Sequence, residues 1–197
     1  MTANHARSDS EDSVGYDAAR GPLPWELDFW NAVTLPQLVG VLAFIGWVAA
    51  AASFSDDQWV PILDSANLAF HEAGHPLLGL FGPTLGLYGG TLGQLVFPLI
   101  TTAAFLQRRQ AHAVAACGAW CGENLLNIGR YMADARAQEL PLVGGGEHDW
   151  WHIFTRWGLL ERDTLIGGAT RGFGWLVMFA CAGALVWLWR AQRQTAA

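Results

Sequence analysis

The chain has 197 residues, of which 52% are hydrophobic and 14% are charged, and its mean hydropathy is +0.23. So little charge beside so much apolar content favours a membrane protein over a water-soluble one. The net charge of −6 and the absence of lysine exclude a surface for nucleic acid, which needs clustered cations to neutralise phosphates. We therefore expect the lipid bilayer as a partner and no nucleic acid; the oligomeric state stays open.

The N-terminal segment differs in kind from the rest of the chain. Residues 1–30 are polar, with few large apolar side chains, and cannot build a core, so we interpret them as a mobile tail before a membrane domain at residues 31–193. A cleavable signal peptide would place its apolar stretch near the start of the chain. Here that stretch begins after Asn31 and is too long for such a role, so it is expected to remain as a membrane span.

Four stretches are apolar enough to be predicted as spans, and a bilayer-crossing helix needs about 20 such residues. Tryptophans flank the first of them, as expected at membrane interfaces. Residues 134–171 are polar and rich in glycine and tryptophan, so we place them at the interface. The predicted fold is an all-α, polytopic helix bundle, in a bacterial-type inner membrane or a plasma membrane. Its spans are Val33–Ser53, Leu92–Gln107, Ala111–Ala133 and Phe173–Trp189.

A further helix, Pro61–Phe81, is predicted to be embedded in the membrane and carries the sequence HEAGH near its middle. The glycine-rich stretch Gly82–Thr91 follows, and we expect a hairpin or re-entrant loop there. Such backbone is tolerated at membrane depth only where protein or water covers it. The orientation of the chain depends on whether Pro61–Phe81 spans or re-enters, and the arginine distribution does not decide it.

The HEAGH sequence places two histidines and a glutamate in an otherwise apolar run. His71 and His75 are four residues apart, so on a helix both rings project from one face and can bind one metal ion. Glu72 lies beside them and can act on water as a general base. Because each ionisable group at the centre of a membrane helix costs at least about 2.5 kcal/mol, three together indicate a shared role. We predict a Zn²⁺ site.

Pro76 directly follows His75 and is the local feature that most threatens this assignment. Proline removes the backbone donor that would bond to Glu72 and crowds the preceding turn, so a kink is expected at the site. A kink that ended the helix would turn His75 away from the metal.

One candidate for the third ligand is Asp134. Glu123, Asn127, Tyr131 and Asp134 are spaced by four, four and three residues, which places them on one face of the predicted helix. Asp134 could therefore face the HEAGH helix across the bundle, with Asn127 and Tyr131 supporting the site or touching a substrate. Glu123 lies deeper in the span and is either structural or part of the site.

The competing candidate is His148, in the sequence GEHDWWH. A loop folded over the metal could bring His148 in as a ligand, with Asp149 orienting a ring nitrogen from behind and His152 nearby. A simpler interpretation is an amphipathic interfacial helix anchored by its tryptophans, with solvated histidines. We expect whichever of His148 and Asp134 is not a ligand to support the site.

The HEAGH sequence in an apolar helix, followed by glycines and further spans, resembles the site-2-protease-like intramembrane zinc metallopeptidases. The resemblance covers roughly Leu68–Gln94 and implies zinc held by His71 and His75, with Glu72 as the base. Members of that family take a third ligand from a later aspartate near a short glycine-containing motif. This sequence has no clean copy of that motif.

The leading hypothesis is a zinc metallopeptidase that cuts peptide bonds of membrane-anchored proteins or peptides. One alternative is a non-catalytic membrane subunit whose closed metal site holds its helices together, since a shared motif does not guarantee a shared function. Another is a di-iron oxidative enzyme with histidine boxes. The supply of histidines argues against it, because only five remain outside the N-terminal tail.

Overall fold

The computed structural model describes residues 23–54, 58–143 and 146–195, so most of the expected N-terminal tail lies outside the described residues. Within these ranges the chain is all-α and contains no strand. Two short 3₁₀ helices, η1 (Leu27–Phe29) and η3 (Leu160–Arg162), accompany six α-helices. These are α2 (Leu35–Phe54), α3 (Leu63–Gly79), α4 (Pro83–Gln107), α5 (Ala111–Ala133), α6 (Asp149–Trp157) and α7 (Asp163–Thr195).

Three helical stretches of the described chain are long and apolar enough to cross a membrane: Leu35–Phe54, Pro83–Gln107 and Leu160–Thr195. The first corresponds to the span expected at Val33–Ser53, and the last contains the span expected at Phe173–Trp189. The helix expected at Ala111–Ala133 is present as α5 with the same bounds. It is not one of the three apolar stretches, because polar residues occupy one of its faces.

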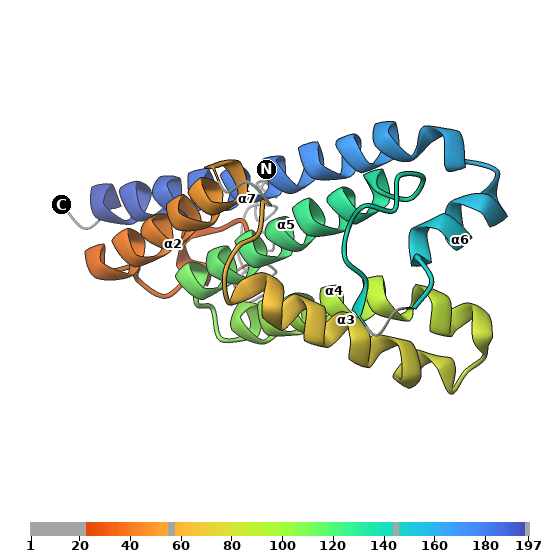
Figure 1. Ribbon diagram of the computed structural model, residues 1–197. Helices are drawn as coiled ribbons and strands as arrows, with labels where there is room; N and C mark the ends of the chain where they lie inside the picture. The colour runs from red at the N-terminus through yellow and green to blue at the C-terminus, as the bar shows by residue number, and fades with distance from the viewer. Residues whose placement is uncertain (1–22, 55–57, 144–145, 196–197) are drawn as a thin grey trace, which may run out of the picture.

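The helix α5 is the centre of the arrangement (Figure 1). It packs most extensively against α7 and also contacts α4 and α2, while α3 and α4 form a hairpin on the other side of it. A buried apolar core joins α2, α5 and α7 and includes Ile45, Val48, Ala119, Met178 and Leu185. The α3–α4 hairpin lies against α5 mainly through α4.

Glycines let the backbones of α5 and α7 touch. A Cβ atom added at Gly122 would lie 2.8 Å from the carbonyl oxygen of Gly174, and one at Gly129 would lie 2.6 Å from that of Gly167. No larger residue fits at such distances. Small residues at helix contacts are typical of helix packing in membranes, where close backbone approach replaces the hydrophobic driving force of water.

The glycine-rich stretch Gly82–Thr91, expected to be a hairpin or re-entrant loop, is helical from Pro83 onward. Only residues 80–82 form the turn, at which Gly82 has a φ of 123° and Pro83 occupies the first helical position. The other glycines of this stretch pack against α3: a Cβ atom at Gly89 would lie 2.9 Å from the Cα atom of His75. The glycines serve helix packing rather than a long turn.

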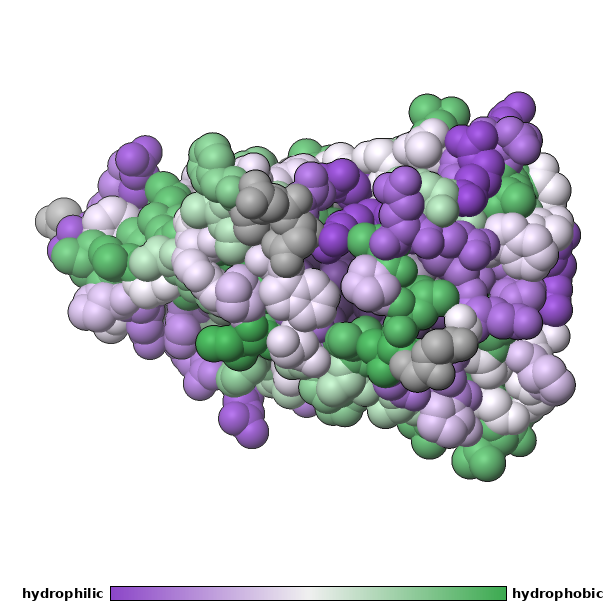
Figure 2. Space-filling view, viewed as in Figure 1, coloured by the Kyte–Doolittle hydropathy of each residue, from purple (hydrophilic) through white to green (hydrophobic). Residues whose placement is uncertain are grey.

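Large apolar side chains remain exposed along the long helices, among them Trp47, Ile100, Phe173, Leu176 and Phe179. Figure 2 shows hydrophobic side chains over α2 on this face, whereas hydrophilic ones gather around the segment that joins α5 to α6. Such an apolar exterior suits contact with lipid chains.

Candidate metal centre

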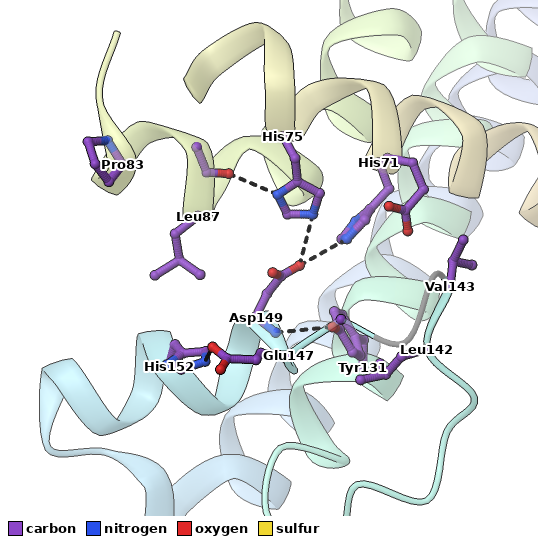
Figure 3. Close-up of a pocket in the computed structure, with 13 residues that line it drawn as sticks. His71, His75, Pro83, Leu87, Tyr131, Leu142, Val143, Glu147, Asp149 and His152 are labelled. Carbon is purple, nitrogen blue, oxygen red and sulfur yellow. Dashed lines mark hydrogen bonds and ion pairs between the residues drawn. The ribbon is translucent and has the colours of Figure 1, made fainter. Parts of the chain in front are cut away.

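Three side chains from two distant parts of the chain converge on one point. His71 and His75 project from α3, and Asp149 is the first residue of α6 (Figure 3). The Oδ2 atom of Asp149 lies 3.0 Å from Nε2 of His71 and 3.2 Å from Nε2 of His75. One nitrogen or oxygen atom from each residue lies within 4.8 Å of the others, so the cluster could hold a metal ion.

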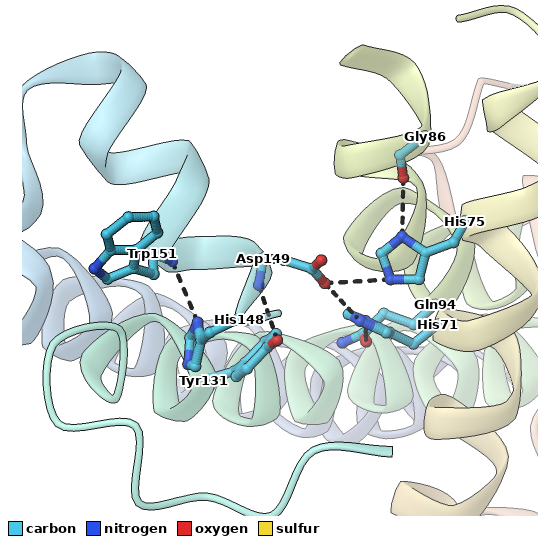
Figure 4. A network of polar contacts seen from close by, with 8 residues as sticks. All are labelled: His71, His75, Gly86, Gln94, Tyr131, His148, Asp149 and Trp151. Carbon is cyan, nitrogen blue, oxygen red and sulfur yellow. Dashed lines mark hydrogen bonds and ion pairs between the residues drawn. The ribbon is translucent and has the colours of Figure 1, made fainter. Parts of the chain in front are cut away.

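Hydrogen bonds on the far side of each ring fix its tautomer (Figure 4). Nδ1 of His75 lies 2.9 Å from the carbonyl oxygen of Gly86, which can only accept, so this nitrogen carries the hydrogen. Nδ1 of His71 donates in the same way to Oε1 of Gln94, at 3.0 Å. In each neutral ring the lone pair is therefore on Nε2, and both lone pairs point at Asp149.

Three acceptors facing one another repel unless a proton or a cation lies among them. Burial raises the pKa of Asp149, but where a proton lies between the carboxylate and Nε2 of a histidine, the hydrogen bonds with His71 and His75 lower this pKa to about 2, so the carboxyl group is ionised at neutral pH. Metal ligands must be deprotonated, and an outer hydrogen bond that orients a histidine is a regular feature of metal sites. This donor set fits a divalent cation.

Polar contacts with α5 hold the first half of α3 in place. Asn67 donates to Oε2 of Glu123 at 2.7 Å, and Asn127 donates to Oδ1 of Asp64 at 3.0 Å. Asp64, Asn67 and Glu123 are almost fully buried. These bonds fix the rotation of α3 about its own axis. They therefore also fix the direction in which the rings of His71 and His75 project, one to two turns further along the helix.

Pro76 lies inside α3, which continues to Gly79. The proline therefore does not end the helix at the site, and His75 faces Asp149 together with His71. Because proline has no N–H, the carbonyl group of Glu72 lacks its usual helical donor.

Packing and capping together place Asp149. Trp150, Ile153 and Phe154, at helical spacing, bury the inner face of α6. His148 is the N-cap of α6, and its Nδ1 accepts the backbone N–H of Trp151 at 3.2 Å. The carboxylate of Asp149 thus begins the helix, where the helix dipole favours negative charge.

The structure places Asp149, rather than His148 or Asp134, beside the two imidazoles of α3. Nε2 of His148 instead lies 3.4 Å from Oδ2 of Asp134, and burial lowers the pKa of His148, which favours its neutral form. Asp134 also accepts the backbone N–H groups of Glu139 and Leu140. The position of His148 at the cap, turned away from His71, is the physical reason for this difference from the expected ligand set (Figure 4).

The other predicted residues lie in three different places. Glu123 and Asn127 contact Asn67 and Asp64 as described above, so they support α3 directly, away from the three converging side chains. Tyr131 lies at the site: its hydroxyl oxygen accepts the backbone N–H of Asp149 at 3.1 Å, and its ring packs against that of His148. His152 forms an ion pair with the exposed carboxylate of Glu147.

The three converging residues line a cavity of about 460 Å³. Glu72, Tyr131, Glu147 and His152 belong to the same wall, together with apolar residues such as Leu87 and Leu142. Glu72 is exposed and shares this space with both histidines. The candidate base and the candidate metal ligands therefore line the same cavity.

Two features of the site were not predicted from the sequence: the acceptors that fix the histidine tautomers. Gln94 is the polar residue within the apolar stretch Leu92–Ile100, and its position there is a sequence signal for a role in the site. The carbonyl group of Gly86 has no sequence signal, because any residue has a carbonyl group and only the packing of α4 on α3 selects this one.

We expect Gly90→Ala to weaken metal binding by about tenfold to a hundredfold, the range found when the support of a ligand is disturbed. A Cβ atom at Gly90 would lie 2.7 Å from Cδ2 of His71, so the ring would have to leave its position between Gln94 and Asp149. Competition with a coloured chelator measures the affinity. Gly46→Ala is the matched control, since a Cβ atom there meets nothing within 4 Å. Equal affinities in the two variants would contradict the packing described.

Comparison of the chain with protein-family models, curated proteins and solved structures finds no match.

Proposed function

We propose that this protein is an integral membrane zinc metallopeptidase in which His71, His75 and Asp149 hold the metal and Glu72 is the general base. The observation that carries the proposal is the convergence of two Nε2 lone pairs and one carboxylate on a cavity that Glu72 also lines. Two histidines and one carboxylate form a ligand set used by catalytic zinc sites, which keep a further position open. A closed, structural site would not need a cavity of about 460 Å³ beside it.

Zinc at this position would supply a Lewis acid that polarises the scissile carbonyl group and makes water acidic enough to react near neutral pH. Glu72 accepts the proton of the attacking water and passes it to the leaving amine. Gln94 and the carbonyl group of Gly86 keep the hydrogens of His71 and His75 on Nδ1, away from the metal. Tyr131 holds the backbone of Asp149, and therefore its carboxylate, in position.

The proposed setting is a multi-pass membrane protein. We assign the membrane crossings to α2, α4 and α7 and propose α5 as a fourth, because it packs against all three of them. The hairpin partner α3 then lies within the membrane-embedded part of the bundle. Peptide segments of membrane-anchored proteins are the proposed substrates, since these reach a site on such a helix without leaving the bilayer.

Removing single carboxylates tests which residue completes the site. The purified protein is expected to bind about one zinc ion per chain, Asp149→Asn to lose most of it after dialysis, and Asp134→Asn to keep it. The matched pair works because each aspartate lies beside a histidine, yet only Asp149 faces the two histidines of α3, whereas Asp134 faces His148. Elemental analysis gives the zinc content. Zinc retained by Asp149→Asn but lost from Asp134→Asn would overturn the ligand assignment, and wild-type protein without any metal would overturn the proposed function.

A further inference from the structure

A second cavity, of about 250 Å³, adjoins the candidate metal centre. It shares His71, Glu72, Tyr131, Leu142 and Val143 with the first cavity. The two volumes therefore meet at the first histidine and at the proposed base. A peptide bond held at that point would place one neighbouring residue in each cavity.

The walls that belong only to the second cavity include large apolar side chains from separate parts of the chain, beside the polar residues Asp64, Asn127 and Arg130. Leu68 comes from α3, Trp59 from the segment before that helix, and Leu140 and Pro141 from the segment after α5. Leu68 precedes His71 by three residues and Glu72 by four, so these side chains share one face of α3. An apolar group against Leu68 would lie next to the reacting atoms.

Gln94 adds a polar requirement to this cavity. Its side chain is buried and lines the cavity, and its Oε1 atom is engaged with His71. Its Nε2 atom is buried with no hydrogen-bond partner. Buried polar groups are nearly always satisfied, so a buried donor without a partner, in a residue that lines a cavity, indicates that an occupant supplies the acceptor. The acceptor that every peptide carries is a backbone carbonyl oxygen.

We propose that the second cavity binds the substrate residue on one side of the scissile bond, and that this residue has a large apolar side chain and a carbonyl oxygen that accepts from Gln94. The inference rests on the proposed function, because the cavity receives a peptide only if the adjoining centre acts on one. It goes further by assigning a side-chain preference and the residues that set it.

Binding of uncut peptides tests this preference. In the Glu72→Gln protein, labelled peptides with leucine at the selected position should bind at least about tenfold more tightly than peptides with alanine, since even one methylene in an apolar pocket is worth about tenfold or more. Fluorescence anisotropy measures the affinity. Leu68→Trp, which fills the cavity, should remove the preference. Leu77→Trp is the matched control on the same helix, because Leu77 is exposed and lines neither cavity.

Gln94→Glu is a second variant that does not depend on filling space. A glutamate keeps an acceptor for Nδ1 of His71 but removes the N–H donor, so metal should be retained while binding of all the peptides weakens by about tenfold or more. Equal binding of leucine and alanine peptides, or a preference unchanged by Leu68→Trp, would overturn the inference. If wild-type, metal-loaded protein binds leucine peptides selectively but never cuts them, the proposed function falls while the cavity preference stands.

Discussion

Glu72→Gln is expected to lower the rate of peptide-bond hydrolysis by about a hundredfold to ten-thousandfold, the range attributed to a positioned general base. Glutamine has the shape of glutamate but cannot accept a proton from water. The zinc content should stay at about one ion per chain, because Glu72 is not one of the three converging ligands. Hydrolysis of a fluorogenic peptide and elemental analysis of the same preparation measure the two quantities.

Glu147→Gln is the control for this substitution. Glu147 lines the same cavity, but its side chain is 83% exposed and is paired with His152 rather than with the converging residues. Its loss should leave hydrolysis nearly unchanged, as is usual for an exposed ion pair. A Glu72→Gln protein that keeps its metal and its full activity would rule out the proposed mechanism.

The placement of His71 and His75 is the part of the site that local sequence indicates best. Residues four apart share a face of any α-helix, whatever the rest of the chain does. The contacts of both rings with Asp149 agree with this rule even though Pro76 follows at once. The long apolar helices are similarly accessible to prediction, because their length and composition are local properties.

The choice between His148 and Asp149 depends on the register of α6, which local rules predict poorly. Aspartate is a preferred N-cap residue, so propensity alone would place Asp149 at the cap and leave His148 free for the metal. The structure has the opposite arrangement, in which His148 caps the helix. Burial of Ile153 and Phe154 on the inner face of α6 fixes that register, and such tertiary packing is not visible in a short sequence pattern.

The glycines of α4 could have either of two structural roles, and the sequence alone does not distinguish them. Clustered glycines indicate turns in soluble proteins. In membrane helices they also mark surfaces where two backbones touch. Gly86, Gly89 and Gly93 have the packing role, because they lie against the backbone of α3. The deciding factor is the presence of a partner helix, here α3 just before them in the chain.

Gly89→Ala should therefore destabilise the protein and release its metal together. Alanine in a helix normally stabilises by about 0.5–1 kcal/mol relative to glycine. Here the new Cβ atom would lie 2.8 Å from the carbonyl carbon of Gly74 and 2.9 Å from the Cα atom of His75, and backbone cannot move aside as a side chain can. Overpacking of this kind costs about 1–3 kcal/mol, which exceeds the gain in helix propensity. The free energy of unfolding should fall by this difference.

The coupling to metal binding follows from the geometry of the hairpin. Moving α4 away from α3 would separate Gly86 from His75 and Gln94 from His71, so both rings would lose the hydrogen bonds that keep Nε2 free for the metal. Gly40→Ala in α2 is the control, because a Cβ atom there meets nothing within 4 Å. Denaturant titration in detergent and chelator competition measure the two effects. A Gly89→Ala protein as stable as Gly40→Ala, with unchanged metal affinity, would mean that contact between these two backbones does not hold the site together.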